Sequence, residues 1–458
     1  MSLSLKVMIN KERTKVLFAE SNSDFINVLL SFLTIPLGKL VTVLQKHNES
    51  AAIGSLTTLY KGLSELDTAH FSTRGAKEML LNPRSSFQPE CRKLALDVAG
   101  IGLLQHFLCE DVNCNGADGR LNISLYPDVA KCVKCGRPLN RGIIFGECMD
   151  QGGAFVISPL FFIISDDLRV APIVTGNFEA LTDFGISETQ GAEVKSLCLG
   201  FHEILELLKL SLTSATPLTD MILKKNTVEN IQYGIRLSHV HQAAAATESN
   251  KIVSRAFLHK STNKFLFAES SDELVELLLS FLTVPLGGVE FLLGSSAPLK
   301  CIDNLYKSVL YGIDEMYFST SDTKNRLINP KLPHGYLSKN QQLLPLSEGG
   351  RPKLYWKERW IPYNPAGDGS HSHTCYKKLN KIEFGMKKTM CFVSDDLTIS
   401  PSLASRISIL NDAGIPLSDV KEAEFHIGHN EALGILKASL ISKTALTDGL
   451  IKPKSCLS

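Results

Sequence analysis

The stretch "KVLFAESNSDFINVLLSFLTIPLG" (residues 15–38) has a close copy later in the chain. It returns as "KFLFAESSDELVELLLSFLTVPLG" (residues 264–287), with 15 of the 24 positions identical and no gap. Shorter matches follow in the same order in both halves, including "SDDL" at Ser165 and Ser394. Collinear agreement of this extent predicts a tandem duplication of one module.

The duplication divides the chain into two predicted domains. Residues 1–238 form the first copy and residues 251–458 the second, and the polar, alanine-rich residues 239–250 between them have the composition of a solvated linker. The first copy is the longer one because it holds an insert with four cysteines, at residues 107–148. The second copy has a degenerate insert at the same place.

Hydrophobic patterning within one copy predicts a mixed module of the α+β or α/β class. Apolar segments on both sides of a charged turn predict a β-hairpin over residues 5–20. Ser21, with Asp24 three residues later, predicts the N-cap of a helix that kinks or ends before Pro36. The apolar run at residues 154–168 predicts a buried strand. The expected order is hairpin, helices, then strand, helix, strand and helix.

The insert contains "CEDVNCNGADGRLNISLYPDVAKCVKCG" (residues 109–136), a C-x4-C-x17-C-x2-C pattern. Two thiolates of a C-x2-C turn converge on one ion, and two such pairs are typical of a zinc ribbon. Gly136 follows the second pair and supplies the positive φ of such a turn. The predicted ligands are Cys109, Cys114, Cys132 and Cys135.

A site with four thiolate ligands has no open position, so the zinc would be structural and the ribbon a staple. Four reduced thiols without a metal remain the alternative. The ribbon could also present a contact surface for a protein or a nucleic acid, because basic residues surround its second cysteine pair: Lys131, Lys134, Arg137 and Arg141.

The second copy keeps no C-x2-C pair. It offers His371, His373 and Cys375 in "SHSHTC", with Cys391 further on. Alternate residues of a strand share a face, so a mixed histidine and cysteine site is conceivable there. A degenerate remnant of the first copy's insert is the favoured interpretation.

The composition argues against several classes of partner. The 48 basic and 47 acidic residues leave a net charge of +1, which gives no global attraction to nucleic acid or to an anionic membrane. Apolar runs fall short of the ~20 residues of a membrane span, and early charges interrupt any signal-peptide core. We therefore expect a soluble protein of the cytoplasm or nucleus, with reduced cysteines.

The duplicated "FAES…LLSFLTxPLG", the cysteine segment, "SDDL" and the closing "LTD" together resemble a plant-specific family, catalogued as domain of unknown function 674 (DUF674). The resemblance covers almost the whole chain. It implies a duplicated plant protein without an established activity, substrate or cofactor. The family's cysteine pattern matches Cys109, Cys114, Cys132 and Cys135.

The sequence identifies no catalytic residue. It contains no P-loop, no G-x-G-x-x-G and no G-x-S-x-G. Three classes of function stay open: an interaction or scaffold protein with a protein partner, an enzyme with a cleft between the copies, and a nucleic-acid binder that uses the basic ribbon. The first, a non-enzymatic role, is favoured.

Overall fold

The computed structural model describes most of the chain. The described residues are 2–48, 51–101, 105–114, 123–143, 154–173, 179–223, 251–294, 297–333, 335–337, 343–349, 355–356, 373–374, 385–388, 390–401, 407–408, 410–411 and 414–451. All structural statements below concern these residues.

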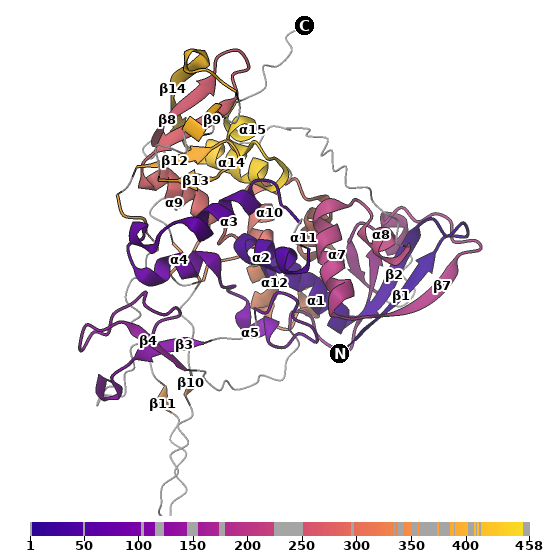
Figure 1. Cartoon of the computed structure of the whole chain (residues 1–458). Helices are drawn as coiled ribbons and strands as arrows, with labels where there is room; N and C mark the ends of the chain where they lie inside the picture. The colour runs from indigo at the N-terminus through magenta and orange to yellow at the C-terminus, as the bar shows by residue number, and fades with distance from the viewer. Residues whose placement is uncertain are drawn as a thin grey trace, which may run out of the picture.

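A five-stranded antiparallel sheet forms at one end of the molecule (Figure 1). Its order is β6-β5-β2-β1-β7. The alternation of apolar and polar residues along β1 buries every second side chain against the helices, as a strand with one covered face requires. The strands are β1 (Leu3–Ile9), β2 (Val16–Asn22), β5 (Phe161–Ser165), β6 (Val170–Pro172) and β7 (Glu193–Leu199).

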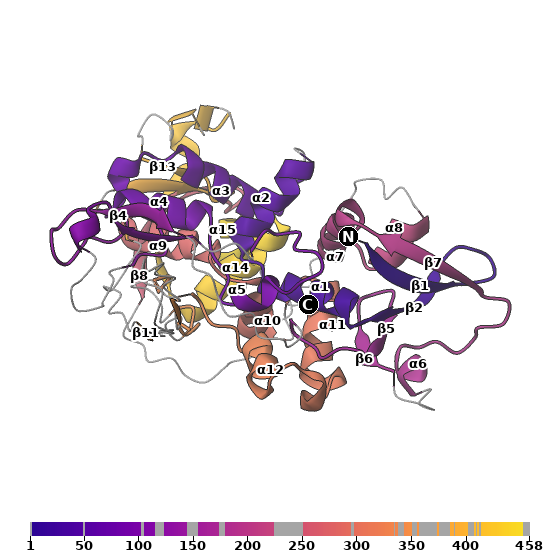
Figure 2. The ribbon, with the colours of Figure 1, turned by 90° about the horizontal axis from the view of Figure 1, so that it is seen from below.

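A second five-stranded antiparallel sheet lies at the opposite end of the molecule (Figure 2). Its strand order is β13-β12-β9-β8-β14. In both sheets the first hairpin of the half lies in the middle and the last strand of the half lies at one edge. The strands are β8 (Ile252–His259), β9 (Phe265–Ser270), β12 (Cys391–Ser394), β13 (Ile399–Ser400) and β14 (Val420–Ile427).

Helices fill the space between the two sheets (Figure 1). The first half contributes α1 (Ser23–Ser31), η1 (Phe32–Thr34), α2 (Leu37–His47), α3 (Leu56–Glu65), η2 (Thr68–His70), α4 (Arg74–Leu81), α5 (Gln88–Cys91), α6 (Glu179–Asp183), α7 (Phe201–Thr213) and α8 (Pro217–Leu223). The second half contributes α9 (Asp272–Phe281), α10 (Leu286–Leu293), α11 (Lys300–Lys307), η5 (Ser308–Gly312), η6 (Glu315–Tyr317), α12 (Ser321–Ile328), η7 (Leu417–Asp419), α14 (His429–Ile441) and α15 (Ala445–Leu450).

The two halves meet where each carries the sequence "PLG". Pro36 and Pro285 form an antiparallel bridge, and the N–H of Leu37 donates to the carbonyl of Val284 at 2.9 Å. The N–H of Gly38 donates to the carbonyl of Leu282 at 2.8 Å. A Cβ on Gly38 would lie 3.1 Å from that carbonyl oxygen, which is tighter than ordinary van der Waals contact. Glycine at this position therefore permits the close approach of the two backbones.

Beyond this junction, each half places a helix against elements of the other half. Helix α3 packs on β13 and α9, and the Ser55 hydroxyl donates to the carbonyl of Ser442 at 2.6 Å. Helix α11 packs on α7, and the Asn304 amide donates to the carbonyl of Asp167 at 2.8 Å. One hydrophobic core accordingly contains buried residues from both halves.

The expected fold class, mixed α and β, is confirmed. The hairpin and the helix ending before Pro36 are present, and β7 and α7 are the last strand and helix of the expected order. The predicted cap is wrong: the Asn22 side chain accepts from the N–H of Phe25, whereas the Ser21 hydroxyl donates to the carbonyl of Ser4. The domain division at residues 239–250 stays a prediction, because these residues lie outside the described part.

Candidate metal centre

A small antiparallel ribbon projects beside α4 (Figures 1 and 2). It consists of β3 (His106–Cys109) and β4 (Leu139–Ile143), with the 3-10 turn η3 (Val112–Cys114) after β3. Cys109 pairs with Leu139 across the two strands. This pairing brings the end of β3 next to the turn that precedes β4, although the two segments are far apart in sequence.

The ribbon gathers the four cysteines that the sequence predicted as ligands. The Sγ atoms of Cys109, Cys114, Cys132 and Cys135 all lie within 4.8 Å of one another. The Sγ atoms of Cys109 and Cys135 are 3.5 Å apart. Four sulfur atoms around a tetrahedral zinc ion, at about 2.3 Å each, would be separated by about 3.8 Å. The donor set and its spacing therefore fit a tetrahedral metal ion.

The backbone holds the second cysteine pair in a tight turn. Gly136 has a φ of +74°, and its N–H donates to the carbonyl of Cys132 at 2.8 Å. The N–H of Cys132 donates to the carbonyl of Arg137 at 2.7 Å. Residues other than glycine rarely adopt this positive φ, so the predicted role of Gly136 is confirmed.

Hydrogen bonds of this turn favour a thiolate at Cys132. Burial alone would raise the pKa of the Cys132 thiol, but the N–H groups of Cys135 and Lys134 donate to its sulfur and lower the pKa to about 7. Contact with Cys135 raises the pKa of Cys114 to about 12, and burial raises the pKa of Cys109. Binding of a cation at the four sulfurs would release the protons that these thiols hold.

The ribbon has little hydrophobic material of its own around the thiols. Three of the cysteines are buried in a cluster whose other members are Ala130 and Leu139. Units with cores this small rarely hold their structure without a metal or a disulfide. The four thiols therefore lie where a larger domain would have its hydrophobic core.

The basic residues of the predicted contact surface lie around the same turn. Lys131, Lys134 and Arg137 are exposed, and Arg141 is half-buried. Two of the four also hold the ribbon together: Lys134 Nζ donates to the carbonyl of Asn113 at 3.0 Å, and Arg141 Nε donates to the carbonyl of Cys109 at 3.2 Å.

The mixed histidine and cysteine site of the second copy falls only partly within the described residues. His371 and Cys375 lie outside the described residues, and only the backbone of His373 is described, in β11 (His373–Thr374), which pairs with β10 (Tyr355–Trp356). Cys391 is buried at the start of β12, where it pairs with Ser270. Within the described ranges, the four cysteines of the ribbon are the group whose ligand atoms converge.

The repeated acids of "SDDL" hold the fold together. Asp166 accepts hydrogen bonds from the N–H and the hydroxyl of Thr219, at 2.8 and 2.7 Å. Asp395 accepts from Thr447 at the same two distances. Both threonines belong to the repeated "LTD". The spacing of the sequence does not reveal that "LTD" is hydrogen-bonded to "SDDL". Burial raises the pKa of Asp395 to about 6.

The family described as "Protein of unknown function (DUF674)" matches residues 1–430 and 380–458. The chain belongs to the DUF674 family. Comparisons with curated proteins and with solved structures give no match. No helix in the described part of this DUF674 protein is long and apolar enough to cross a membrane. The family description names no activity, so the function has to be argued from the cysteine cluster and its surroundings.

Proposed function

We propose that this DUF674 protein is a non-enzymatic interaction scaffold whose ribbon is held by one structural zinc ion. The convergence of four cysteine sulfurs within 4.8 Å supports the proposal. Thiolate sets of this kind select zinc or iron–sulfur clusters, and tetrahedral sites with a C-x2-C turn are typical of structural zinc. Because the protein would supply all four ligands, no position remains for a substrate.

The scaffold would be a tandem duplication with a zinc-ribbon-like insert at residues 107–148. The common order of strands in the two sheets supports the duplication. The bonds of Asp166 to Thr219 and of Asp395 to Thr447 are a further correspondence, because they recur with the same donors and acceptors. Helix α3 packs on the second half and α11 packs on the first half, and these contacts would make the two halves one rigid support for the ribbon.

The turn between Cys132 and Cys135 would be the contact surface for a protein partner. Val133 is 69% exposed there, between the exposed Lys131 and Lys134. An apolar side chain within a ring of cations fits a partner segment that combines an apolar anchor with acidic residues. Nucleic acid is less favoured, because phosphate contacts need the cations but have no use for exposed Val133.

Cobalt substitution tests the coordination directly. Protein refolded with Co²⁺ should show the visible absorption of a tetrahedral thiolate site, and Zn²⁺ should displace that absorption. The Cys132→Ser/Cys135→Ser variant should lack the absorption, while Cys198→Ser, at an exposed cysteine of β7, should keep it. An octahedral cobalt spectrum in the wild-type protein would contradict the proposal.

The contact surface is tested with Val133→Glu in a chain that still binds zinc. A partner that copurifies with the wild-type protein should be lost from Val133→Glu and kept by Val194→Glu. Val194 is a matched control because it is 61% exposed on β7, far along the chain from the ribbon. The nucleic-acid hypothesis would instead be favoured by a strongly salt-dependent complex with an oligonucleotide that Val133→Glu does not affect.

A further inference from the structure

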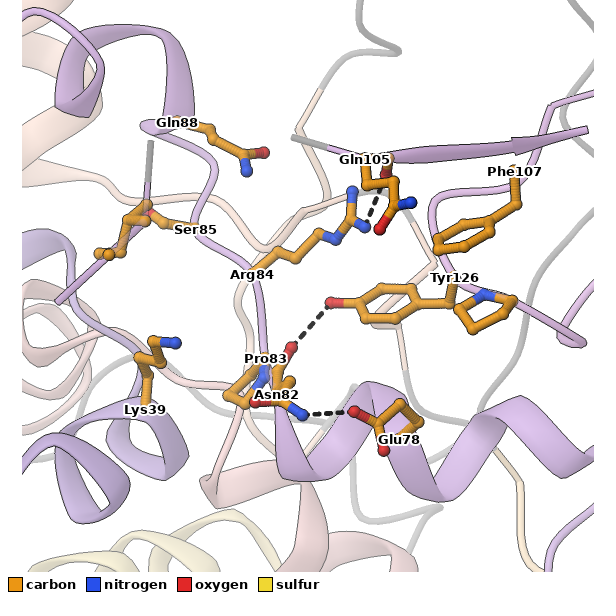
Figure 3. A pocket seen from close by; sticks show the side chains of 13 residues that line it. Lys39, Glu78, Asn82, Pro83, Arg84, Ser85, Gln88, Gln105, Phe107 and Tyr126 are labelled. Atoms are coloured by element: carbon orange, nitrogen blue, oxygen red, sulfur yellow. Dashed lines mark hydrogen bonds between the residues drawn. The ribbon is translucent and has the colours of Figure 1, made fainter. Parts of the chain in front are cut away.

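A cavity of about 280 Å³ opens where the ribbon meets the helices of the first half (Figure 3). Helices α2 and α4 and the segment after α4 form one side. Residues just before and within β3, together with the segment that carries Tyr126, form the other. The cavity is lined by Lys39, Glu78, Asn82, Pro83, Arg84, Ser85, Gln88, Gly100, Ile101, Gln105, Phe107, Tyr126 and Pro127.

Arg84 is the polar side chain that crosses this space. Its Nη2 donates to the carbonyl of Gln105 at 2.9 Å, and its guanidinium carbon lies 4.5 Å from the centre of the Tyr126 ring. Its Nη1 is buried and has no hydrogen-bond partner among the described residues. A buried guanidinium N–H without an acceptor is costly, so an acceptor bound in the cavity would favour a small rotation of the guanidinium that turns Nη1 towards it.

Lys39 supplies a second positive charge from α2. Burial lowers the pKa of Lys39, and the neighbouring Lys46 lowers it further, while Asp97 acts in the opposite direction. Figure 3 shows the side chains of Lys39, Arg84 and Gln88 arranged around one space. A cation and a guanidinium that are both partly removed from water attract an anion more strongly than exposed cations do.

The acidic residue of the lining leaves the cations in excess. Glu78 is the one carboxylate among the lining residues, and its side chain already accepts from the amide of Asn82. Lys39 and Arg84 against Glu78 give the lining a net charge of +1. The rest of the lining mixes uncharged polar side chains with the apolar Pro83, Ile101 and Phe107, so the cavity combines an anion site with a surface for a carbon skeleton.

We propose that this cavity binds a small organic anion. Its carboxylate or phosphate would accept from Arg84 Nη1 and from Lys39 Nζ, and its planar or apolar body would lie against Phe107 and Ile101. The cations of this site come from α2 and from the segment after α4, and Phe107 comes from strand β3 of the ribbon, so binding is measured in protein whose zinc content is known.

The two cations of this site have no counterpart at the matching positions of the second half, both of which are described. Continuing the repeat without a gap places Gly288 opposite Lys39, and the shared "NP" places Lys331 opposite Arg84. Lys331 is exposed, and neither residue contributes to the cavity. One ligand per chain is therefore expected, and Lys331 offers a matched control.

Isothermal titration of the full chain with phenyl phosphate, benzoate, inorganic phosphate and neutral benzamide tests the proposal. Phenyl phosphate or benzoate should bind at one site per chain, and the preferred one of the two identifies the anionic group. Inorganic phosphate should bind more weakly, because it leaves Phe107 and Ile101 without contact. Benzamide should not bind.

The variants assign the binding to this cavity. Lys39→Gln and Arg84→Lys should each weaken the preferred probe about tenfold or more, as expected for the loss of a charge-assisted hydrogen bond. Lys331→Gln should leave the affinity unchanged. Lys39→Gln separates loss of binding from misfolding, because none of the hydrogen bonds observed among the described residues involves the Lys39 ammonium group. The melting temperature of this variant should match that of the wild type.

Two results would overturn the proposal. One is the absence of saturable binding of every anionic probe at millimolar concentration in folded protein. The other is binding that Lys39→Gln and Arg84→Lys leave unchanged. Neither result bears on the zinc site, whose failure would appear as missing metal in the same preparation.

Discussion

Replacing Glu290 by leucine should stabilise the protein. Glu290 lies on α10 with 1% of its surface exposed, and neither carboxyl oxygen has a hydrogen-bond partner among the described residues. The ungapped repeat places Val41, also buried, at the corresponding position of α2. The second half thus buries a carboxyl group where the first half buries a hydrocarbon side chain.

The magnitude follows from the missing hydrogen bonds. A buried polar group without a partner costs about 1–3 kcal/mol of folding free energy, and leucine fills a similar volume. We therefore expect Glu290→Leu to raise the free energy of unfolding by about 1–3 kcal/mol. Urea denaturation followed by circular dichroism measures this change as a shift of the midpoint.

The effect should also depend on pH. Burial raises the pKa of Glu290 well above its ordinary value of 4.5, Asp303 adds to the increase, and Lys307 opposes it. Because the folded state holds this proton more tightly than the unfolded state, the contribution of Glu290 to stability falls as the pH rises above 4.5. The advantage of Glu290→Leu over the wild type should therefore grow from pH 4.5 towards pH 8.

Glu276 on α9 provides a control of opposite sign. It is equally buried, but its carboxylate accepts from the N–H of Met386 at 2.7 Å. Glu276→Leu leaves that N–H unpaired and should lower the free energy of unfolding by about 1–3 kcal/mol. A destabilised Glu290→Leu, or an advantage that does not change with pH, would refute this reasoning.

Two further predictions concern a hydrogen-bonded pair within the second half and the junction between the two halves. Asp395→Ala removes the acceptor for both donors of Thr447 and should cost about 1–3 kcal/mol at pH 4, measured by urea denaturation. The cost should shrink as the pH rises through about 6, because the raised pKa of Asp395 makes its charged form unfavourable in the fold; a cost that grows with pH would contradict this. Gly38→Ala forces a Cβ to within 3.1 Å of the Leu282 carbonyl oxygen and should destabilise the junction between the halves by about 1–3 kcal/mol. Hydrogen exchange at Gly38 and Leu37 should then speed up, and unchanged protection would show that the junction tolerates the added methyl group.

The sequence predicted what local patterns encode. The repeat located the hairpins and the helices after them, and the C-x2-C spacing located a turn that a positive φ at Gly136 completes. The buried run at residues 154–168 proved shorter as a strand, since β5 begins only at Phe161. Pro159 lies within that run, and proline cannot donate to a strand ladder.

Contacts between distant segments could not be predicted in this way. An apolar helix face shows that α3 is buried, but it carries no information on whether the sheet of its own half or of the other half covers it. The cavity has the same origin, because Lys39, Arg84 and Tyr126 come from three segments without a common motif. The predicted N-cap is one residue too early, because Ser21 and Asn22 are both good capping residues. The Ser21 hydroxyl instead bonds to the neighbouring strand β1, and Asn22 caps the helix.

The metal content of the purified chain decides whether one zinc ion holds the ribbon. We expect about one zinc per chain in the wild type and in Cys198→Ser, as four thiolates for one tetrahedral ion require. Cys132→Ser/Cys135→Ser should contain almost none, and its ribbon should lose protection from hydrogen exchange between β3 and β4. Wild-type protein without zinc, or a double variant that keeps both its zinc and its protected ribbon, would contradict the account.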